Sequence, residues 1–118
     1  MLFMDRFGQA LLQSERHKKM VALLTIGLDH FKYINDLHGH DIGDQLLLDI
    51  AKSINSELKG IESLARIGGD IFALLTKDIG HHDDAARLAS SLNSIITGPR
   101  NIGGLNLQVT ASIGIAVY

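Results

Sequence analysis

Two glycines and an acid interrupt an apolar run at Gly68-Gly69-Asp70. The apolar residues resume directly afterwards, from Ile71 to Leu75. This pattern predicts a tight hairpin that carries Asp70 at its tip. Glycines let a backbone come close to a bulky ligand, and an acid beside them can hold a cation. The stretch is therefore a candidate binding site.

A second polar group lies between Asp29 and Asp44 and contains two glycines, Gly39 and Gly43. It follows the apolar run Val21–Ile26, which predicts a strand buried on both faces. An amphipathic helix is predicted after it. Because ligands commonly bind beyond the carboxyl end of a strand, this group is a second candidate binding region.

Both stretches resemble the GGDEF family, the diguanylate cyclases. The hairpin is similar to the family's signature loop, with Ile71 where the second acid of that loop belongs. The other stretch resembles the family pattern Asp-x-Asp-x-Phe-Lys-x-Ile-Asn-Asp, followed by Gly-His and Gly-Asp, and lacks only the first Asp. With Ser112-Ile113-Gly114 near the end, the resemblance covers almost the whole chain in the right order.

The resemblance implies a domain that binds GTP with two metal ions in each of two facing protomers and condenses the nucleotides to cyclic di-GMP. Asn35 and Asp44 would hydrogen-bond the guanine, because an amide both donates and accepts while a carboxylate accepts from N–H groups. Lys32 would meet phosphate as a mobile point charge. The implied substrate-binding residues are Lys32, Asn35, Asp44, Phe31, Gly68 and Gly69.

The resemblance also implies a magnesium site. Asp70 would bind the ion and serve as the catalytic acid, with the Leu28 carbonyl nearby. Gly27 stands where the family has its other main metal ligand, and Ile71 stands where it has a Glu at the reaction centre. Two magnesium ions need anionic oxygen ligands, and Ile71 offers no proton acceptor. The departures therefore predict impaired cyclase activity and a weak magnesium site.

Asp29 could replace the missing metal ligand. It lies two residues after Gly27, so it points to the same side if the strand persists. It would have to reach about 6.6 Å further along. The competing interpretation is that Asp29 and Asp36 cap the short helix that follows.

The family's product-inhibition site is an Arg-x-x-Asp, matched here by Lys59-Gly60-Ile61-Glu62. The charges are kept, but Lys lacks the bidentate fork of Arg. Whether Lys59 and Glu62 bind cyclic di-GMP is therefore left open. Residues 1–118 are expected to be a single partial domain, because the family's opening Asp-x-Leu-Thr-Gly-Leu-x-Asn-Arg and its segments after Ser-x-Gly have no match.

Hydrophobic periodicity predicts the elements that position these residues. The order is helix, strand, two helices, hairpin, helix, strand, which predicts an α+β, ferredoxin-like βαββαβ core of nucleotidyl-cyclase type, with helices flanking an antiparallel sheet. The predicted segments are helix from Phe3 to the basic run at Lys19, strand Val21–Ile26, helix Phe31–Leu37, helix from Asp41 or Gly43 to Leu58, the Gly68-Gly69 hairpin, helix from Asp83 to a stop at Gly98-Pro99, and strand Leu105–Ala111 continued as Ile113–Tyr118.

Several polar and aromatic residues also have a purely structural interpretation. Asp44 could be a first-turn acid of its helix, and Arg66 could pair with an acid to hold the hairpin. Phe31 and Phe72 are expected in the core rather than as stacking platforms. His81 and His82 are expected in a solvated loop.

Composition limits the classes that remain. The chain has 118 residues, 46% hydrophobic and 20% charged, with a net charge of -2, which is typical of one globular domain and argues against nucleic acid or membrane as partners. It has no cysteine, so disulfides and thiolate zinc sites are excluded. The apolar run Met20–Leu28 is too short to span a bilayer, and the absence of a signal pattern predicts a cytoplasmic location.

Three functions are compatible with these residues. The first is a regulatory module that binds GTP, pairs with a second GGDEF protomer and adjoins an EAL phosphodiesterase or sensory domain. The second is a residual diguanylate cyclase that uses Asp70 and Asp29. The third is an interaction domain that dimerises without nucleotide.

Overall fold

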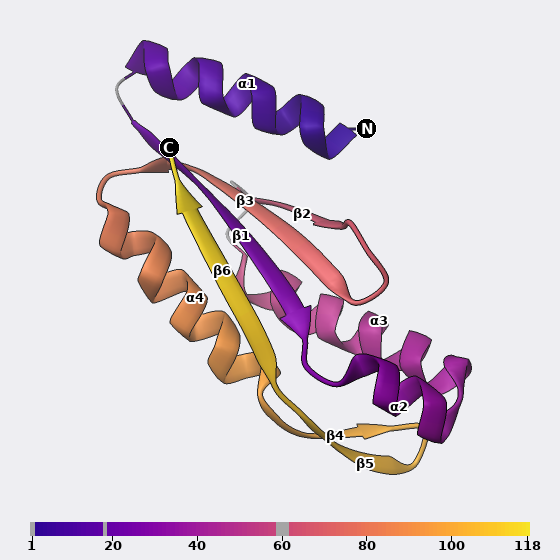
Figure 1. Cartoon of the computed structure of the whole chain (residues 1–118). Coiled ribbons are helices and arrows are strands. Elements are labelled where there is room, and N and C mark those ends of the chain that lie inside the picture. Colours follow the sequence, from indigo (N-terminus) through magenta and orange to yellow (C-terminus); the bar gives the residue numbers. More distant parts are fainter. Residues whose placement is uncertain (1, 18, 59–61) are drawn as a thin grey trace.

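The computed structural model describes residues 2–17, 19–58 and 62–118. The elements alternate between helices and strands in an α+β arrangement (Figure 1). In chain order they are α1 (Leu2–His17), β1 (Met20–Leu28), α2 (Phe31–His38), α3 (His40–Glu57), β2 (Glu62–Arg66), β3 (Ile71–Ile79), α4 (His82–Ile96), β4 (Gly98–Ile102), β5 (Leu105–Val109) and β6 (Ala111–Val117).

The main sheet has four strands in the order β2-β3-β1-β6, and every neighbouring pair is antiparallel. β1 and β2 are joined through α3 and are separated in the sheet by β3, while β3 and β6 are joined through α4 and are separated by β1. This interleaving confirms the predicted ferredoxin-like βαββαβ core. The central strand β1 pairs with β3 at Gly27–Ile71 and with β6 at Gly27–Ser112.

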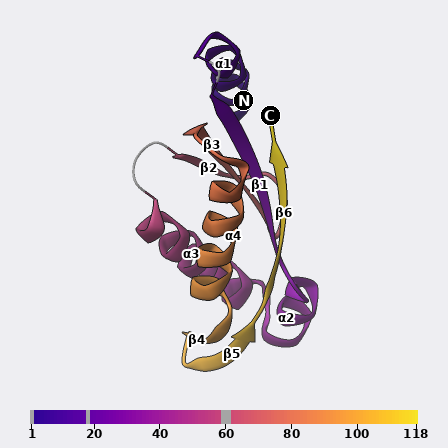
Figure 2. The ribbon, with the colours of Figure 1, turned by 90° about the vertical axis from the view of Figure 1, so that its left-hand side faces the viewer.

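Helices cover both faces of the sheet, as the views in Figures 1 and 2 show. α3 and α4 pack on one face, over a core that includes Leu24, Ile26 and Leu74. α1 packs on the other face through Phe3 and Ala10. Because alternate residues of a strand point to opposite faces, the apolar residues of β1 serve both cores. The prediction of a doubly buried strand is confirmed from Val21 to Leu24, whereas Thr25 is exposed.

The segment from residue 98 to residue 117 differs from the prediction of one continuous strand. β4 and β5 form a separate two-stranded sheet, and only β6 joins the main sheet. The turn between β4 and β5 consists of Gly103 and Gly104, with φ values of 58° and 84°. Two glycines with positive φ form the tight turn that hairpins prefer, and the pair was overlooked in the sequence.

Arg100 anchors this second hairpin to the helices. Its guanidinium donates to Asp49 Oδ2 at 2.6 Å and to Ser53 Oγ at 3.0 Å on α3, and its Nε donates to the Ile96 carbonyl at 3.2 Å. The Arg100 side chain is only 11% exposed, so the contacts are shielded from solvent. β5 is thereby held close to α2.

Two helix starts also differ from the sequence predictions. α3 begins at His40, and Asp44 lies beyond its first turn. α4 begins at His82 and is capped by His81, so these histidines form the helix start rather than a loop, although both are exposed. Across the described ranges, no helix combines the length and apolarity needed to cross a bilayer.

Candidate nucleotide site

The Gly68-Gly69 hairpin connects β2 to β3 and is closed by short contacts. The Ile67 amide donates to the Ile71 carbonyl at 2.9 Å, and Arg66 Nε donates to the Gly68 carbonyl at 3.1 Å. Arg66 therefore holds the hairpin through a backbone oxygen, not through an acid as the structural interpretation had it. Asp70 is half-buried at the end of the loop.

The hairpin lies directly beside the end of β1. The Leu28 amide donates to the Asp70 carbonyl at 3.2 Å, so the backbones of the two predicted metal-binding residues are in contact. Gly27, one residue earlier, pairs with Ile71. A Cβ built on Gly27 would meet only the Ser112 carbonyl oxygen, at 4.0 Å. The position that holds a metal ligand in the family therefore has room for a side chain.

Asp29 lies on the other side of β1 from Asp70. Its amide donates to the Thr110 carbonyl at 3.0 Å, and its carboxylate accepts from Ser112 Oγ at 2.7 Å and Thr110 Oγ1 at 2.8 Å. The hydrogen bond from Ser112 makes the largest contribution to lowering the pKa of Asp29, followed by the one from Thr110, because both stabilise the anion. Each oxygen of this carboxylate already has a partner, which ties the start of α2 to the segment entering β6.

The predicted capping role of Asp29 and Asp36 is wrong. The N-cap of α2 is His30, in the left-handed region with φ of 60°, and its side chain makes no capping hydrogen bond. Asp36 lies inside the helix. The hydroxyls of Thr110 and Ser112 attract Asp29 instead, and their contribution could not be read from spacing because they follow it by more than 80 residues.

The metal ligands available around Asp70 fit one magnesium ion better than two. Asp70 supplies one carboxylate, Gly27 supplies no side chain, and the carboxylate oxygens of Asp29 accept from hydroxyls. Mg²⁺ is commonly held by one or two carboxylates together with substrate phosphates. Asp70 alone meets that minimum for a single ion, and the set is too small to fix a second.

The other side of the site is built where α2 crosses α3. Asn35 Oδ1 is buried and finds no hydrogen-bond partner among the described residues. A Cβ on Gly43 would overlap this oxygen and would lie 3.2 Å from Phe31 Cζ. Gly43 therefore gives the Asn35 amide its place against α3, next to Asp44 in the chain. Asn35 packs against Gly43 of α3, and Asp44 is the next residue of that helix.

A cavity of about 620 Å³, within the size range of small-ligand sites, lies between α3 and the β2–β3 hairpin. Asp44 and Arg66 supply its charged lining, and Phe72 contributes an aromatic wall. Phe31 and Phe72 are 8% and 3% exposed, which confirms that both belong to the core. Lys32 is exposed on α2. The cavity extends from Asp44 to Arg66, the last residue of β2.

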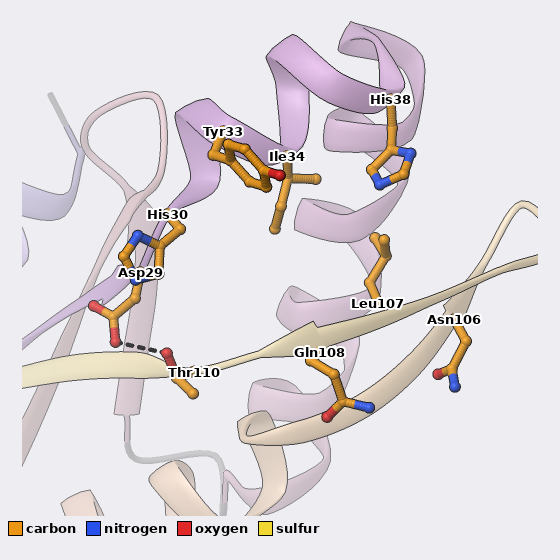
Figure 3. Close-up of a pocket in the computed structure, with 9 residues that line it drawn as sticks. All are labelled: Asp29, His30, Tyr33, Ile34, His38, Asn106, Leu107, Gln108 and Thr110. Carbon is orange, nitrogen blue, oxygen red and sulfur yellow. Dashed lines mark hydrogen bonds between the residues drawn. The ribbon is translucent and has the colours of Figure 1, made fainter.

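A second cavity, of about 530 Å³, lies between α2 and β5 and was not predicted from the sequence (Figure 3). Tyr33 and Ile34 line it from α2, and Leu107 lines it from β5. Asp29 and its partner Thr110 close one end. It was missed because β5 had been assigned to the continuous final strand.

The predicted product-inhibition residues are only partly described. Lys59 lies outside the described residues. Glu62 begins β2 and is half-buried, facing a smaller cavity of 270 Å³ beneath α1 that Arg6 and Lys77 also line. Whether Lys59 and Glu62 bind cyclic di-GMP therefore stays open.

Comparison with known proteins agrees with this arrangement. Residues 1–118 match the family model described as diguanylate cyclase, GGDEF domain. The chain therefore belongs to the GGDEF family, and it is a GGDEF domain of cyclic di-GMP signalling.

Individual relatives support the assignment. The chain is 41% identical over 118 residues to the bifunctional diguanylate cyclase/cyclic di-GMP phosphodiesterase MucR of Pseudomonas aeruginosa, covering 100% of this chain and 17% of that protein. It is 37% identical over 116 residues to the cyclic di-GMP phosphodiesterase NbdA of the same species, covering 98% of this chain and 15% of that protein. The chain thus spans about a sixth of the length of these two relatives.

A solved structure shows the same fold. The crystal structure of the GGDEF domain of TpbB (YfiN) from Pseudomonas aeruginosa superimposes with a TM-score of 0.96 at 36% identity. The match covers 99% of this chain and 73% of that one. The antiparallel four-stranded sheet with flanking helices is therefore that of the GGDEF domain.

Proposed function

We propose that this domain binds GTP at the α2–α3 crossing and acts as a regulatory module with impaired cyclase activity. The observation that carries the proposal is the buried, unpartnered Asn35 Oδ1 held against Gly43, beside Asp44. A buried polar atom without a partner costs free energy, so a ligand that supplies a hydrogen-bond donor is favoured there. A guanine base offers N–H donors to both Asn35 and Asp44.

The cavity between α3 and the hairpin supports the same proposal. Its volume of 620 Å³ lies in the range of small-ligand sites, and it leads from Asp44 toward the glycine hairpin. Lys32 is exposed on α2 and free to move toward phosphate as a point charge. Gly68 and Gly69 would let the nucleotide approach the hairpin backbone.

The impairment follows from the donors around Asp70. A single magnesium ion could accompany bound GTP through Asp70, with phosphate oxygens completing its coordination. Ile71 is 39% exposed and carries no proton acceptor for an attacking hydroxyl. Binding of GTP without its efficient condensation is the expected behaviour.

A second candidate function is residual diguanylate cyclase activity. It is favoured by the relatives, which include the diguanylate cyclase TpbB at 36% identity over 117 residues. It would require Asp29 to leave Ser112 and Thr110 and reach a metal on the far side of β1. The printed names of MucR and of an EAL/GGDEF domain protein from M. capsulatus also make an adjoining phosphodiesterase domain a plausible partner to regulate.

Calorimetric titration of the chain with GTP, with and without Mg²⁺, tests the proposal. Saturable binding that Asn35→Ala and Asp44→Ala both weaken is expected. Absence of binding at millimolar GTP and Mg²⁺ would exclude the nucleotide-binding function and favour a dimerisation or interaction domain. Cyclic di-GMP formation in the same sample would favour the cyclase.

A further inference from the structure

Three side chains with metal-binding atoms meet where α4 begins. His81 caps the helix, and His82 and Asp83 are its first two residues. Their side chains are 59%, 68% and 60% exposed, so an ion can reach them from solvent. One ligand atom from each lies within 4.8 Å of the other two.

The spacing of these atoms is compatible with a coordination shell as well as with ion pairs between the imidazoles and the carboxylate. His81 Nδ1 lies 3.4 Å from Asp83 Oδ2, and His82 Nε2 lies 3.5 Å from Asp83 Oδ1. Both distances exceed the usual hydrogen-bond range. Ligands at about 2.0–2.1 Å from a tetrahedral Zn²⁺ are separated by about 3.3–3.4 Å, which is close to what is observed. The imidazoles are already stacked, with ring centroids 4.4 Å apart.

We propose that His81, His82 and Asp83 form a binding site for a divalent transition-metal ion of the Zn²⁺ class, with water completing the coordination. Two imidazole nitrogens and a carboxylate suit Zn²⁺, Ni²⁺ or Cu²⁺, whereas Mg²⁺ prefers an all-oxygen shell. The side chains hold the ion, so the site does not depend on the helix dipole. It is independent of the GTP proposal.

The site lies at the end of the sheet opposite the nucleotide cleft. β3 runs from Ile71, beside the glycine hairpin, to Ile79, which leads into α4 (Figure 1). An ion bound there cannot substitute for the magnesium expected near Asp70. Its effect would be on the start of α4 and on the packing of that helix.

Coordination would replace one capping contact and keep another. His81 Nδ1 accepts from the Asp83 amide at 3.1 Å, and this contact is exchanged for the metal bond. The His81 amide continues to donate to Asp84 Oδ2, at 3.2 Å without the ion. Because the ordered helix start holds the three ligands together, the folded chain should bind the ion more tightly than the unfolded chain, and the ion should raise the thermal stability of the domain.

The test is calorimetric titration of the whole chain with ZnCl₂ in a non-chelating buffer. One Zn²⁺ per chain is expected to bind. Both His82→Ala and Asp83→Asn should weaken the Zn²⁺ affinity at least tenfold. His40→Ala removes another exposed histidine and should leave the affinity within twofold. Titration with MgCl₂ in the absence of nucleotide should not be altered by His82→Ala.

A thermal melt followed by circular dichroism gives a second readout that does not rely on heats of binding. Zn²⁺ in excess should raise the Tm of the parent by several degrees and leave that of His82→Ala unchanged. The proposal is overturned if Zn²⁺ does not bind at 1 mM. It is overturned equally if His82→Ala and His40→Ala have the same effect.

Discussion

The two sides of the nucleotide site differ in what the fold demands of them. On the α2–α3 side, Gly43, Asn35 and Phe31 are packed together, and a methyl group on Gly43 would overlap the Asn35 amide. On the β1–β3 side, Gly27 has open space above it and Ile71 is 39% exposed. The guanine side is thus part of the helix packing, whereas the metal side consists of positions that packing hardly restricts.

This difference explains how a GGDEF domain can lack two of the family's acids and keep its fold. The residues at positions 27 and 71 change the chemistry near Asp70 without removing a core contact. Asn35 is coupled to the contact between α2 and α3, so its loss would alter the packing around it. Under the proposed function, binding and catalysis are therefore expected to be separable, and the following variants are chosen to separate them.

Restoring the two acids should give the largest effect. Gly27→Asp with Ile71→Glu adds one carboxylate on each of two directly paired residues, on the same face of the sheet, where the structure leaves room for side chains. Since even an outer partner of a metal ligand changes affinity about 10–100-fold, the GTP affinity of this variant should gain a Mg²⁺ dependence of about 100-fold. Calorimetry with and without Mg²⁺ measures it.

Gly27→Asp with Ile67→Glu is the matched control for that variant. Ile67 is also exposed on the hairpin, at 48%, but does not stand where the family's Glu belongs. Its Mg²⁺ dependence should be clearly smaller. Equal behaviour of the two variants would mean that added negative charge, not the position of the acid, controls the metal.

Removing a guanine ligand should give the next largest effect. Asp44→Ala deletes a charged hydrogen-bond acceptor, for which about 1.5–3 kcal/mol, or about 10–150-fold in affinity, is expected. Asn35→Ala should fall at the lower end of this range because its hydrogen bonds are neutral. Asp36→Ala, which removes another exposed acid on α2, should leave GTP affinity unchanged; a matching loss there would point to general charge effects.

Gly43→Ala should weaken GTP binding more than it changes stability. The added methyl group displaces the Asn35 amide, for which about tenfold in affinity is expected. Crowding by the methyl group should lower the free energy of unfolding by about 1 kcal/mol or more. The better helix propensity of Ala should offset about 1 kcal/mol of this loss. Urea unfolding and GTP titration of the same sample separate the two quantities.

Gly8→Ala in α1 controls for helix propensity, because a Cβ on Gly8 meets nothing within 4 Å. This variant should raise the free energy of unfolding by about 0.5–1 kcal/mol and leave GTP affinity alone. If Gly43→Ala behaved in the same way, the Asn35 amide would not be the guanine ligand.

The smallest effect concerns the carboxylate of Asp29. Ser112→Ala with Thr110→Val removes the two hydrogen bonds that lower its pKa, so the pKa should rise toward its ordinary value, as measured by NMR titration. A pKa lowered by folding contributes stability above the unfolded-state value of about 3.9, and this is lost as the pH falls through the folded-state pKa. Between pH 5 and pH 2 the parent should therefore lose more stability than the double variant.

The difference in lost stability between the parent and the double variant is expected to stay below about 1 kcal/mol, because the carboxylate is well solvated. An unchanged Asp29 pKa in the double variant would show that the hydroxyl contacts do not stabilise the anion. Asp29 would then be available to other partners, which strengthens the case for residual cyclase activity.

Much of the fold could be predicted from sequence because its signals are local. The stripe of α3, the apolar run of β1 and the glycines of the hairpin each determine an element within a short stretch. The β4–β5 hairpin escaped prediction because Gly103 and Gly104 were not recognised as a turn between strands. The anchoring of that hairpin by Arg100 depends on Asp49, about fifty residues away, and spacing along the chain carries no trace of it.

The site shows the same division. The candidate ligands could be proposed from motifs, but the cap assigned to Asp29 was wrong since its partners come from the segment entering β6. The requirement for Gly43 emerges only when α2 is packed on α3. Motifs therefore nominated the candidate ligands, and packing determined which neighbours they contact.

The most direct test of the central claim is titration of this chain with GTP in the presence and absence of Mg²⁺, followed by a cyclic di-GMP assay on the same sample. Saturable binding without product is the predicted result and would support a regulatory nucleotide site. Binding with product would contradict the claimed impairment, and no binding at millimolar GTP would contradict the nucleotide site itself.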